Sequence, residues 1–321
     1  MRSCLRLTIG SLTAITLLAS AVPGHAQLLM GAMLLRRLNK EDRAREAPPA
    51  PPKRTIPYGT DPLQNLDLTL PNGVKGPVPL VLFVHGGAWT QGNKDNATGN
   101  WKAPHYTAQG YAFASISYRL VPAVRVEDEA ADVAAALARL IADADKLGID
   151  RHRIVLMGHS AGAHLVALVG TDERYLQGSG LSFGDLAGVL PIDGAAYDVP
   201  AQMAAAGSYM QGRYKQAFGT DVARQRAVSP LSYAAAPNAA RFLFINVQRE
   251  DGLAQAKALA DALRQAGAAV QTNQFEGKGL RGHVEINRKL GDPDYPATPV
   301  VDAWLKEAFA QSLTASPATS R

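Results

Sequence analysis

Residues 153–162 read RIVLMGHSAG, a short apolar run that ends in a G-x-S-x-G pentapeptide. The apolar run predicts a buried strand, and the Ala- and Leu-rich stretch 161–169 predicts a helix. A strand that turns abruptly into a helix forces its hinge residue into a strained backbone conformation, and small flanking residues give that turn room. This context predicts that Ser160 is a nucleophile whose hydroxyl stands at the positive end of a helix.

The pattern around this stretch predicts an α/β fold. Strand-like runs occur at 66–70, 78–84, 112–117, 154–157, 189–192, 241–247 and 270–275, and helix-like runs at 129–144, 161–169, 253–266 and 300–312. Strands that alternate with helices of this length indicate a mainly parallel central sheet with helices on both faces. We expect one domain over residues 55–313, with a lid or cap in the irregular segment 172–240 and a flexible tail at 314–321.

The first 26 residues have the form of a secretory signal peptide. Two arginines precede an apolar core at residues 7–19, and small residues precede a predicted cut after Ala26. The core is short for a membrane span, so we expect a secreted or periplasmic protein with no stable span; an uncleaved signal anchor is the alternative. Residues 27–54 form a basic, Pro-rich linker, whose first half we expect to be either a disordered mature N-terminus or a basic amphipathic helix on a membrane surface.

The net charge of +5 arises from the leader and the linker. Residues 27–54 hold seven Lys and Arg residues, and the chain outside residues 1–54 is nearly balanced, with 24 basic and 25 acidic side chains. Nothing in this distribution favours nucleic-acid binding. The only cysteine, Cys4, lies in the predicted signal peptide, so the mature chain would contain no disulfide.

A pair of glycines predicts an oxyanion hole. The run VLFV at 81–84 continues directly into His85-Gly86-Gly87. Two glycines after a strand let backbone N–H groups turn inward, where a side chain would block them. We expect the amides of Gly86 and Gly87, together with that of Ala161, to stabilise an oxyanion; a plain Gly-Gly turn is the alternative.

A serine nucleophile requires a base, and His283 is the candidate. In serine hydrolases that place the nucleophile on such a turn, the order along the chain is serine, then acid, then histidine. Of the seven histidines, His164 and His283 follow Ser160, and His164 lies within the predicted helix directly after the serine, where it points into packing. It lies in the segment 279–286, which we interpret as a loop between the last strand and the C-terminal helix.

Three carboxylates are candidates for the acid that orients the base. Glu250 and Asp251 follow the strand at 241–247, and Gly252 suits a turn that would aim the Asp251 side chain. Asp251 is therefore the preferred acid and Glu250 the alternative. Asp193 is the third candidate, because some hydrolases carry the acid on an earlier strand.

Several separated motifs, taken in order, resemble a known family. HGGAW at 85–89 with QGNK at 91–94, GYAFASISYRL at 110–120 and GHSAGAH at 158–164 are similar to α/β-hydrolase esterases of the hormone-sensitive-lipase and feruloyl-esterase-like type, a pattern that kynurenine formamidases share. The resemblance covers residues 60–310. It implies an α/β-hydrolase fold, a triad of Ser160, Asp251 and His283, and neither a cofactor nor a metal. The loop that carries the acid is shorter than this family commonly has.

These features predict a serine hydrolase that cleaves small-molecule carboxylic esters through an acyl-enzyme on Ser160. An arylformamidase with the same triad is the alternative within hydrolases, although an export signal does not suit kynurenine breakdown. A non-catalytic α/β-hydrolase that serves as a binding module is a third hypothesis. Acyl-chain preference and oligomeric state do not follow from the sequence.

Overall fold

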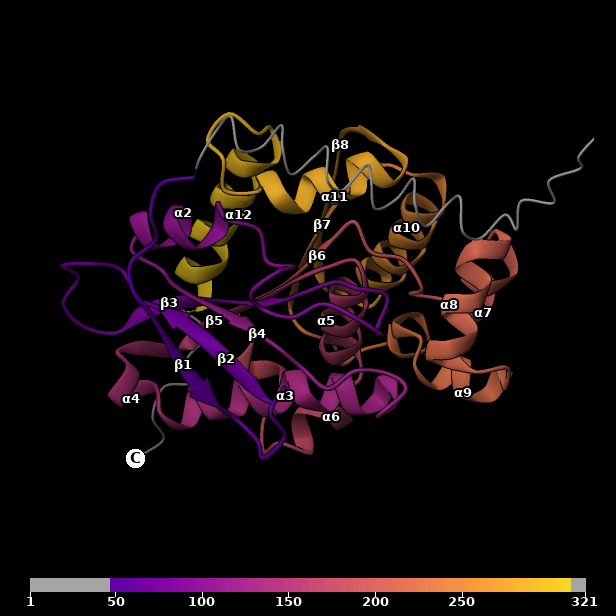
Figure 1. Ribbon diagram of the computed structural model, residues 1–321, viewed down its shortest axis with the longest axis horizontal. Coiled ribbons are helices and arrows are strands. Elements are labelled where there is room, and N and C mark those ends of the chain that lie inside the picture. The colour runs from indigo at the N-terminus through magenta and orange to yellow at the C-terminus, as the bar shows by residue number, and fades with distance from the viewer. Residues whose placement is uncertain (1–46, 313–321) are drawn as a thin grey trace, which may run out of the picture. The chain divides into compact units, whose positions relative to one another are not determined.

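The computed structural model describes residues 47–312, and within them eight strands form one sheet in the order β1-β2-β4-β3-β5-β6-β7-β8 (Figure 1). The strands are β1 (Lys53–Pro57), β2 (Asn65–Thr69), β3 (Val78–Val84), β4 (Ala112–Ile116), β5 (Ile149–His159), β6 (Gly188–Ile192), β7 (Arg241–Gln248) and β8 (Ala269–Lys278). β1, β2 and β4 pair antiparallel, and every pair from β4 to β8 is parallel. The carboxyl ends of β3, β5, β6 and β7 therefore meet at one edge of the sheet.

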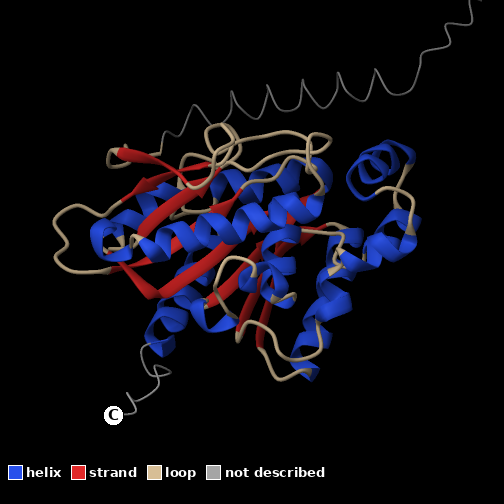
Figure 2. Ribbon diagram, turned by 90° about the horizontal axis from the view of Figure 1, so that it is seen from below, coloured by secondary structure: helices blue, strands red, loops and turns tan. Residues whose placement is uncertain are grey.

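Helices cover both faces of the sheet. The main ones are α2 (Lys102–Ala108), α3 (Val126–Ala142), α5 (Ala161–Thr171), α10 (Glu250–Gln265), α11 (Gly279–Lys289) and α12 (Ala297–Ser312). Figure 1 shows α2 and α12 on one side of the strands and α3 on the other, and Figure 2, seen from below, shows helices lying in front of the strands.

Side chains of the central strands alternate between two apolar cores. On β3, Leu80 and Leu82 belong to the core that α3, α5 and α10 cover, and Val81 and Phe83 belong to the core that α11 and α12 cover. All seven residues of β3 are buried. A strand buried on both faces reads as a continuous apolar run, which is why this strand is recognisable in the sequence.

The segment between β6 and β7 is mostly helical. It contains α7 (Val199–Ala205), α8 (Ser208–Phe218) and α9 (Val222–Ala227), which Figure 1 shows grouped beyond one end of the sheet. The short helices α4 (Ala144–Leu147) and α6 (Arg174–Gln177) complete the set of α-helices within residues 47–312. We call α7, α8 and α9 the cap helices, because they occupy the segment for which the sequence predicts a lid.

The structure confirms the predicted fold class and each of the predicted strands. It adds β1, which begins at Lys53, two residues inside the predicted linker, and pairs with β2. It also corrects one element: residues 279–286, interpreted as a loop, belong to the helix α11. The predicted signal peptide, the linker up to residue 46 and the tail at 314–321 lie outside the described residues. Between residues 47 and 312 no helix has the length and apolar character that crossing a membrane requires.

Candidate active site

Ser160 stands at the turn between β5 and α5. It is the N-cap of α5, with φ of 57° and ψ of −118°, a left-handed conformation that non-glycine residues rarely adopt. Its N–H donates to the carbonyl of Ile192, at the end of the neighbouring strand β6, over 3.0 Å. The strained turn predicted from the G-x-S-x-G sequence is therefore present, and an adjacent strand holds it in place.

The two glycines of the pentapeptide are required by close packing. A Cβ atom on Gly158 would overlap the carbonyl of Gly162, and a Cβ atom on Gly162 would overlap the carbonyl of Val84. The turn can form only where both positions lack a side chain. This is the physical basis of the sequence pattern around Ser160.

His283 connects the serine to a buried carboxylate. Its Nε2 lies 3.0 Å from the Ser160 Oγ, and its Nδ1 lies 2.5 Å from Asp193 Oδ2. With the ring proton on Nδ1, His283 donates to Asp193 and accepts from the serine hydroxyl through Nε2. This is the arrangement in which a histidine can take the serine proton. The structure thus brings Ser160 and His283 together as the sequence predicts.

Asp193 is buried and well supplied with donors. It follows β6 directly, its side chain is 0% exposed, and its Oδ1 accepts from the Val247 N–H over 3.1 Å. Its own N–H donates to the Ile245 carbonyl over 2.7 Å. Burial alone would raise the pKa of Asp193, but His283, the Arg249 charge and the Val247 amide together lower it, so the carboxylate is ionised at neutral pH.

Asp251, the preferred acid in the sequence, does not contact His283. The helix α10 begins at Glu250, so Asp251 lies in its first turn, where its carboxylate accepts from Arg249 over 3.2 and 3.3 Å and from Gln202 over 3.1 Å. Glu250, the alternative acid, is exposed. The carboxylate against His283 is that of Asp193, the third candidate.

Two of the three predicted oxyanion donors, Gly86 and Ala161, lie next to Ser160. A Cβ atom on Gly86 would lie 2.9 Å from the Ser160 Cβ, so the Gly86 backbone passes directly beside the nucleophile. Gly87 has φ of 138°, and its carbonyl accepts from the N–H groups of Thr90 and Gln91, which closes a tight turn. Ala161 is the first residue of α5. Gly86 and Ala161 therefore lie next to Ser160, and Gly87 closes the turn that follows Gly86.

The other histidines near the turn are neutral and structural. Burial lowers the pKa of His85 and of His164 to about 4, and it holds the pKa of His159 well below the usual value. His164 accepts from Trp89 and donates to the Val228 carbonyl. His159 Nε2 donates to the His283 carbonyl over 2.9 Å, and the two rings lie 4.5 Å apart. His159 thus holds the segment that carries the base, a role that the sequence did not reveal.

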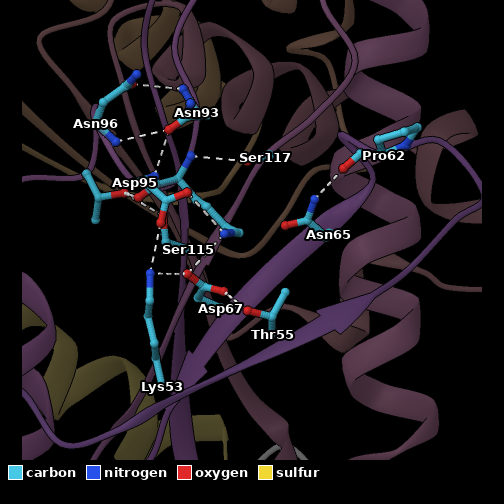
Figure 3. A network of polar contacts seen from close by, with 12 residues as sticks. Lys53, Thr55, Pro62, Asn65, Asp67, Asn93, Asp95, Asn96, Ser115 and Ser117 are labelled. Atoms are coloured by element: carbon cyan, nitrogen blue, oxygen red, sulfur yellow. Dashed lines mark hydrogen bonds and ion pairs between the residues drawn. The ribbon is translucent and has the colours of Figure 1, made fainter.

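A polar network fixes the loop that follows the two glycines (Figure 3). At its centre the buried Asp67 of β2 pairs with Lys53 over 2.6 Å and with Lys94 over 3.1 Å, and it accepts from Thr55 over 2.6 Å. Burial alone would raise the pKa of Asp67, but these donors outweigh burial and lower it. The Lys94 N–H also donates to Ser117. The antiparallel edge of the sheet therefore anchors the loop at its far end.

The fold and the site together define the class of protein. A sheet in this order, with a serine on the turn after β5 and a histidine that reaches it after β8, is the α/β-hydrolase fold. Residues 66–185 match the BD-FAE family model. This segment runs from β2 past the Ser160 turn, so it includes the glycine pair and the nucleophile.

Known proteins agree with the resemblance to α/β-hydrolase esterases. The chain is 39% identical to Esterase LipC of Mycobacterium tuberculosis over 127 residues, which are 38% of this chain and 31% of that protein. It is 35% identical to the isoprenylcysteine alpha-carbonyl methylesterase ICME of Arabidopsis thaliana over 133 residues, 41% of this chain and 31% of that protein. The kynurenine formamidase of Danio rerio is 30% identical over 114 residues, 36% of this chain and 37% of that protein. The match spans about a third of each relative's length.

A solved structure shows the same fold over nearly the whole chain. Esterase B from Lactobacillus rhamnosis superposes with a TM-score of 0.70 at 22% identity, covering 92% of this chain and 97% of that one. At this identity the likeness establishes the fold alone. The α/β-hydrolase fold and the resemblance to its esterases are therefore confirmed.

Proposed function

We propose that the protein is a serine hydrolase that cleaves carboxylic esters of small molecules, with Ser160 as nucleophile, His283 as general base and Asp193 as the acid that orients it. The observation that carries the proposal is the contact of His283 with both partners, 3.0 Å to Ser160 Oγ and 2.5 Å to Asp193 Oδ2. The similarity to named esterases supports the ester as substrate class.

The site holds a chemical group for each step of ester hydrolysis. The Ser160 Oγ attacks the acyl carbon while His283 Nε2 takes its proton, and the amides of Gly86, Gly87 and Ala161 stabilise the oxyanion. The imidazolium then returns the proton to the leaving alkoxide, which departs as the alcohol and leaves an acyl-serine. Water attacks this ester in the same way, again with His283 as base, and releases the acid and free Ser160.

Burial of Asp193 favours the productive tautomer of the base. An ionised carboxylate at Nδ1 holds the proton on that nitrogen, so Nε2 remains free to accept from the serine. It also stabilises the imidazolium that forms when the proton moves. An Asn at this position would donate where Asp193 accepts, and it would select the wrong tautomer.

The test is ester turnover on 4-nitrophenyl butyrate, together with labelling by a fluorophosphonate probe. Ser160→Ala should abolish labelling and lower kcat on the order of 10⁶-fold. Asp193→Asn should lower kcat by about 10⁴-fold, since this is the usual effect of the tautomer change. Asp261→Asn, which removes an exposed carboxylate on α10, is the matched control and should leave kcat unchanged. Thermal melting of each variant separates loss of chemistry from loss of fold.

Three results would contradict the proposal. Full turnover by Ser160→Ala would exclude the nucleophile, and an unlabelled but folded wild-type protein would favour the binding-module hypothesis. Full turnover by Asp193→Asn would exclude Asp193 as the acid.

An amide hydrolase is the second candidate, because the chain is similar to kynurenine formamidases of Danio rerio and Salmo salar. A formamidase would use the same groups on an N-formyl amide. Comparison of kcat/KM on 4-nitrophenyl acetate and on N-formylkynurenine decides between the two. A higher value on the formamide would replace the ester as the substrate class.

We further propose that the protein is exported. The support is the positively charged start, the apolar core at 7–19 and the small residues before Ala26. Expression of the full chain in a bacterial host, followed by N-terminal sequencing of the periplasmic fraction, tests this. A mature N-terminus at Gln27 is expected, and full-length protein confined to the cytoplasm would contradict export.

A further inference from the structure

Arg249 lies between two carboxylates beside the base. Its Nη1 lies 3.1 Å from Asp193 Oδ2, and its Nε and Nη2 donate to Asp251 over 3.3 and 3.2 Å. The side chain is only 16% exposed. A largely buried guanidinium that divides its donors between two acids is built into the site, because burying this charge without both partners would be costly.

The same guanidinium approaches the base itself. Arg249 Nη1 lies 2.6 Å from His283 Nδ1, the nitrogen that also faces Asp193. Both nitrogens carry protons in the productive tautomer, so a positive charge stands against the ring edge that becomes positive when the serine is deprotonated. A neighbouring cation disfavours the imidazolium form, and a neighbouring anion favours it.

Asp251 offsets this charge and connects it to the cap helices. Its carboxylate is 41% exposed, and besides Arg249 it accepts from Gln202 Nε2 on α7 over 3.1 Å. Gln202 in turn donates to the Tyr214 hydroxyl on α8 over 3.1 Å. A continuous polar chain therefore runs from the cap helices through Asp251 and Arg249 to Asp193.

The remaining ionisable groups around this cluster do not compete with the pair. Burial holds the pKa of His159 low and raises the pKa of Tyr197, Tyr214 and Tyr295, so the imidazole and the phenols are uncharged at neutral pH. Lys102 of α2 further lowers the pKa of His159, and Glu285 of α11 further raises the pKa of Tyr295. All of these groups are the same in every variant below.

We propose that Arg249 is a positioning residue that holds Asp193 against His283, and that Arg249 and its counter-ion Asp251 together set the pH range in which His283 acts as a base. This proposal rests on the proposed function. It gives Asp251 a role different from the triad acid that the family resemblance implies, and it makes the cap helices part of the support for the triad.

The two members of the pair should shift the pH profile in opposite directions. In Arg249→Gln the imidazolium gains stability, so the acidic limb of the kcat/KM profile should move up by about one pH unit. In Asp251→Asn the guanidinium is no longer offset, so the limb should move down by about the same amount. In the variant that carries both substitutions, the acidic limb should lie close to its wild-type position, because the two changes cancel.

Arg249→Lys separates charge from geometry. The ammonium keeps the positive charge but lacks the planar fork that contacts two carboxylates at once. The acidic limb should therefore stay near its wild-type position while kcat falls several-fold. A purely structural role would lower kcat in every variant and leave the limb in place.

Lys257 and Asp261 provide matched controls. They form an exposed ion pair at 2.5 Å on the same helix as Asp251. Lys257→Gln and Asp261→Asn change the net charge as Arg249→Gln and Asp251→Asn do, but at the surface, so neither should move the acidic limb.

The assay is the pH dependence of kcat/KM on 4-nitrophenyl butyrate from pH 5 to 9, with thermal melting of each variant. The proposal is supported if the acidic limbs of Arg249→Gln and Asp251→Asn move in opposite directions and the kcat of Asp251→Asn stays within about tenfold of wild type. Replacement of a triad acid would instead lower kcat by about 10⁴-fold. Limbs that stay in place or move together would overturn it while Ser160→Ala and Asp193→Asn remain inactive. A 10⁴-fold loss in Asp251→Asn with an active Asp193→Asn would instead overturn the acid assignment itself.

Discussion

Glu129 on α3 predicts an unusual dependence of stability on pH. Its side chain is fully buried, its Oε1 accepts from the Val121 N–H over 3.2 Å, and its Oε2 has no hydrogen-bond partner among the described residues. Burial raises the pKa of Glu129 to about 9, despite the opposing amide of Val121, and the neighbouring Asp132 raises it further. The folded protein therefore holds this carboxyl protonated at neutral pH.

The sign follows from proton linkage. The pKa of Glu129 is higher in the folded state than its ordinary value of 4.5, so the unfolded chain loses this proton first as the pH rises. Stability therefore falls between about pH 4.5 and pH 9, by about 1.4 kcal/mol for each pH unit. Over the three units from pH 5 to pH 8 the cost is about 4 kcal/mol.

Glu129→Gln removes this dependence. The amide has nearly the same shape, it keeps an oxygen for the Val121 N–H, and it does not titrate. The free energy of unfolding, measured by urea titration at pH 5, 6, 7 and 8, should become larger in the variant relative to the wild type by about 1.4 kcal/mol for each unit of pH, so the variant gains stability over the wild type as the pH rises. Glu276→Gln, which replaces an exposed carboxyl on β8, is the control and should show a constant difference.

One outcome would refute the reasoning. If the difference between Glu129→Gln and the wild type were the same at all four pH values, Glu129 would titrate alike in the folded and unfolded states. The carboxyl would then be ionised inside the protein, and the burial argument would fail. Ester turnover by Glu129→Gln is informative as well. The Val121 N–H donates both to Glu129 and to the carbonyl of Trp89, which lies next to the predicted oxyanion hole.

Two further predictions concern the geometry around the serine. Gly162→Ala places a methyl group against the Val84 carbonyl and should lower stability by at least about 2 kcal/mol. Gly212→Ala, in open space on α8, should instead raise stability by about 0.5–1 kcal/mol. Thermal melting checks both variants, and equal melting temperatures would contradict the packing argument. His159→Leu removes the hydrogen bond to the His283 carbonyl and should lower kcat by up to about a hundredfold with KM unchanged, as steady-state kinetics will show; an unchanged kcat would mean that α11 holds the base without it.

The sequence predicted most of the fold because its central strands are buried on both faces. Val78–Val84 is a continuous apolar run, and residues 242–247 form an apolar run that only Asn246 interrupts; the structure has them in β3 and β7. The edge strand β1 was missed because four of its five residues are exposed and it contains no apolar alternation. The helix α11 was missed because its sequence opens with glycines and reads as a turn.

The serine and the base were predictable from local and ordinal information. Ser160 lies between the two glycines of a pattern that the sequence shows directly; Gly158 is required by its contact with Gly162, and Gly162 by its contact with Val84. Only His164 and His283 follow Ser160, and His164 lies in the helix that begins at the serine, so chain order and the predicted helix together select His283. Both predictions follow from the pattern and from the order of residues along the chain, although the contact that requires Gly162 involves the distant Val84.

The acid depends on distant contacts. Asp193 and Asp251 follow neighbouring parallel strands, so both lie at the sheet edge where His283 approaches, and both precede a glycine. The two carboxylates differ in burial. The side chain of Asp193 is 0% exposed, so its negative charge needs a neighbouring cation, and Arg249 provides that cation. Once Arg249 reaches across to Asp193, Asp251, two residues on, accepts from its remaining donors and turns away from His283. The sequence signal for this site is therefore the combination of Asp193 after β6 with Arg249 and Asp251 after β7, because each of the three explains where the other two point.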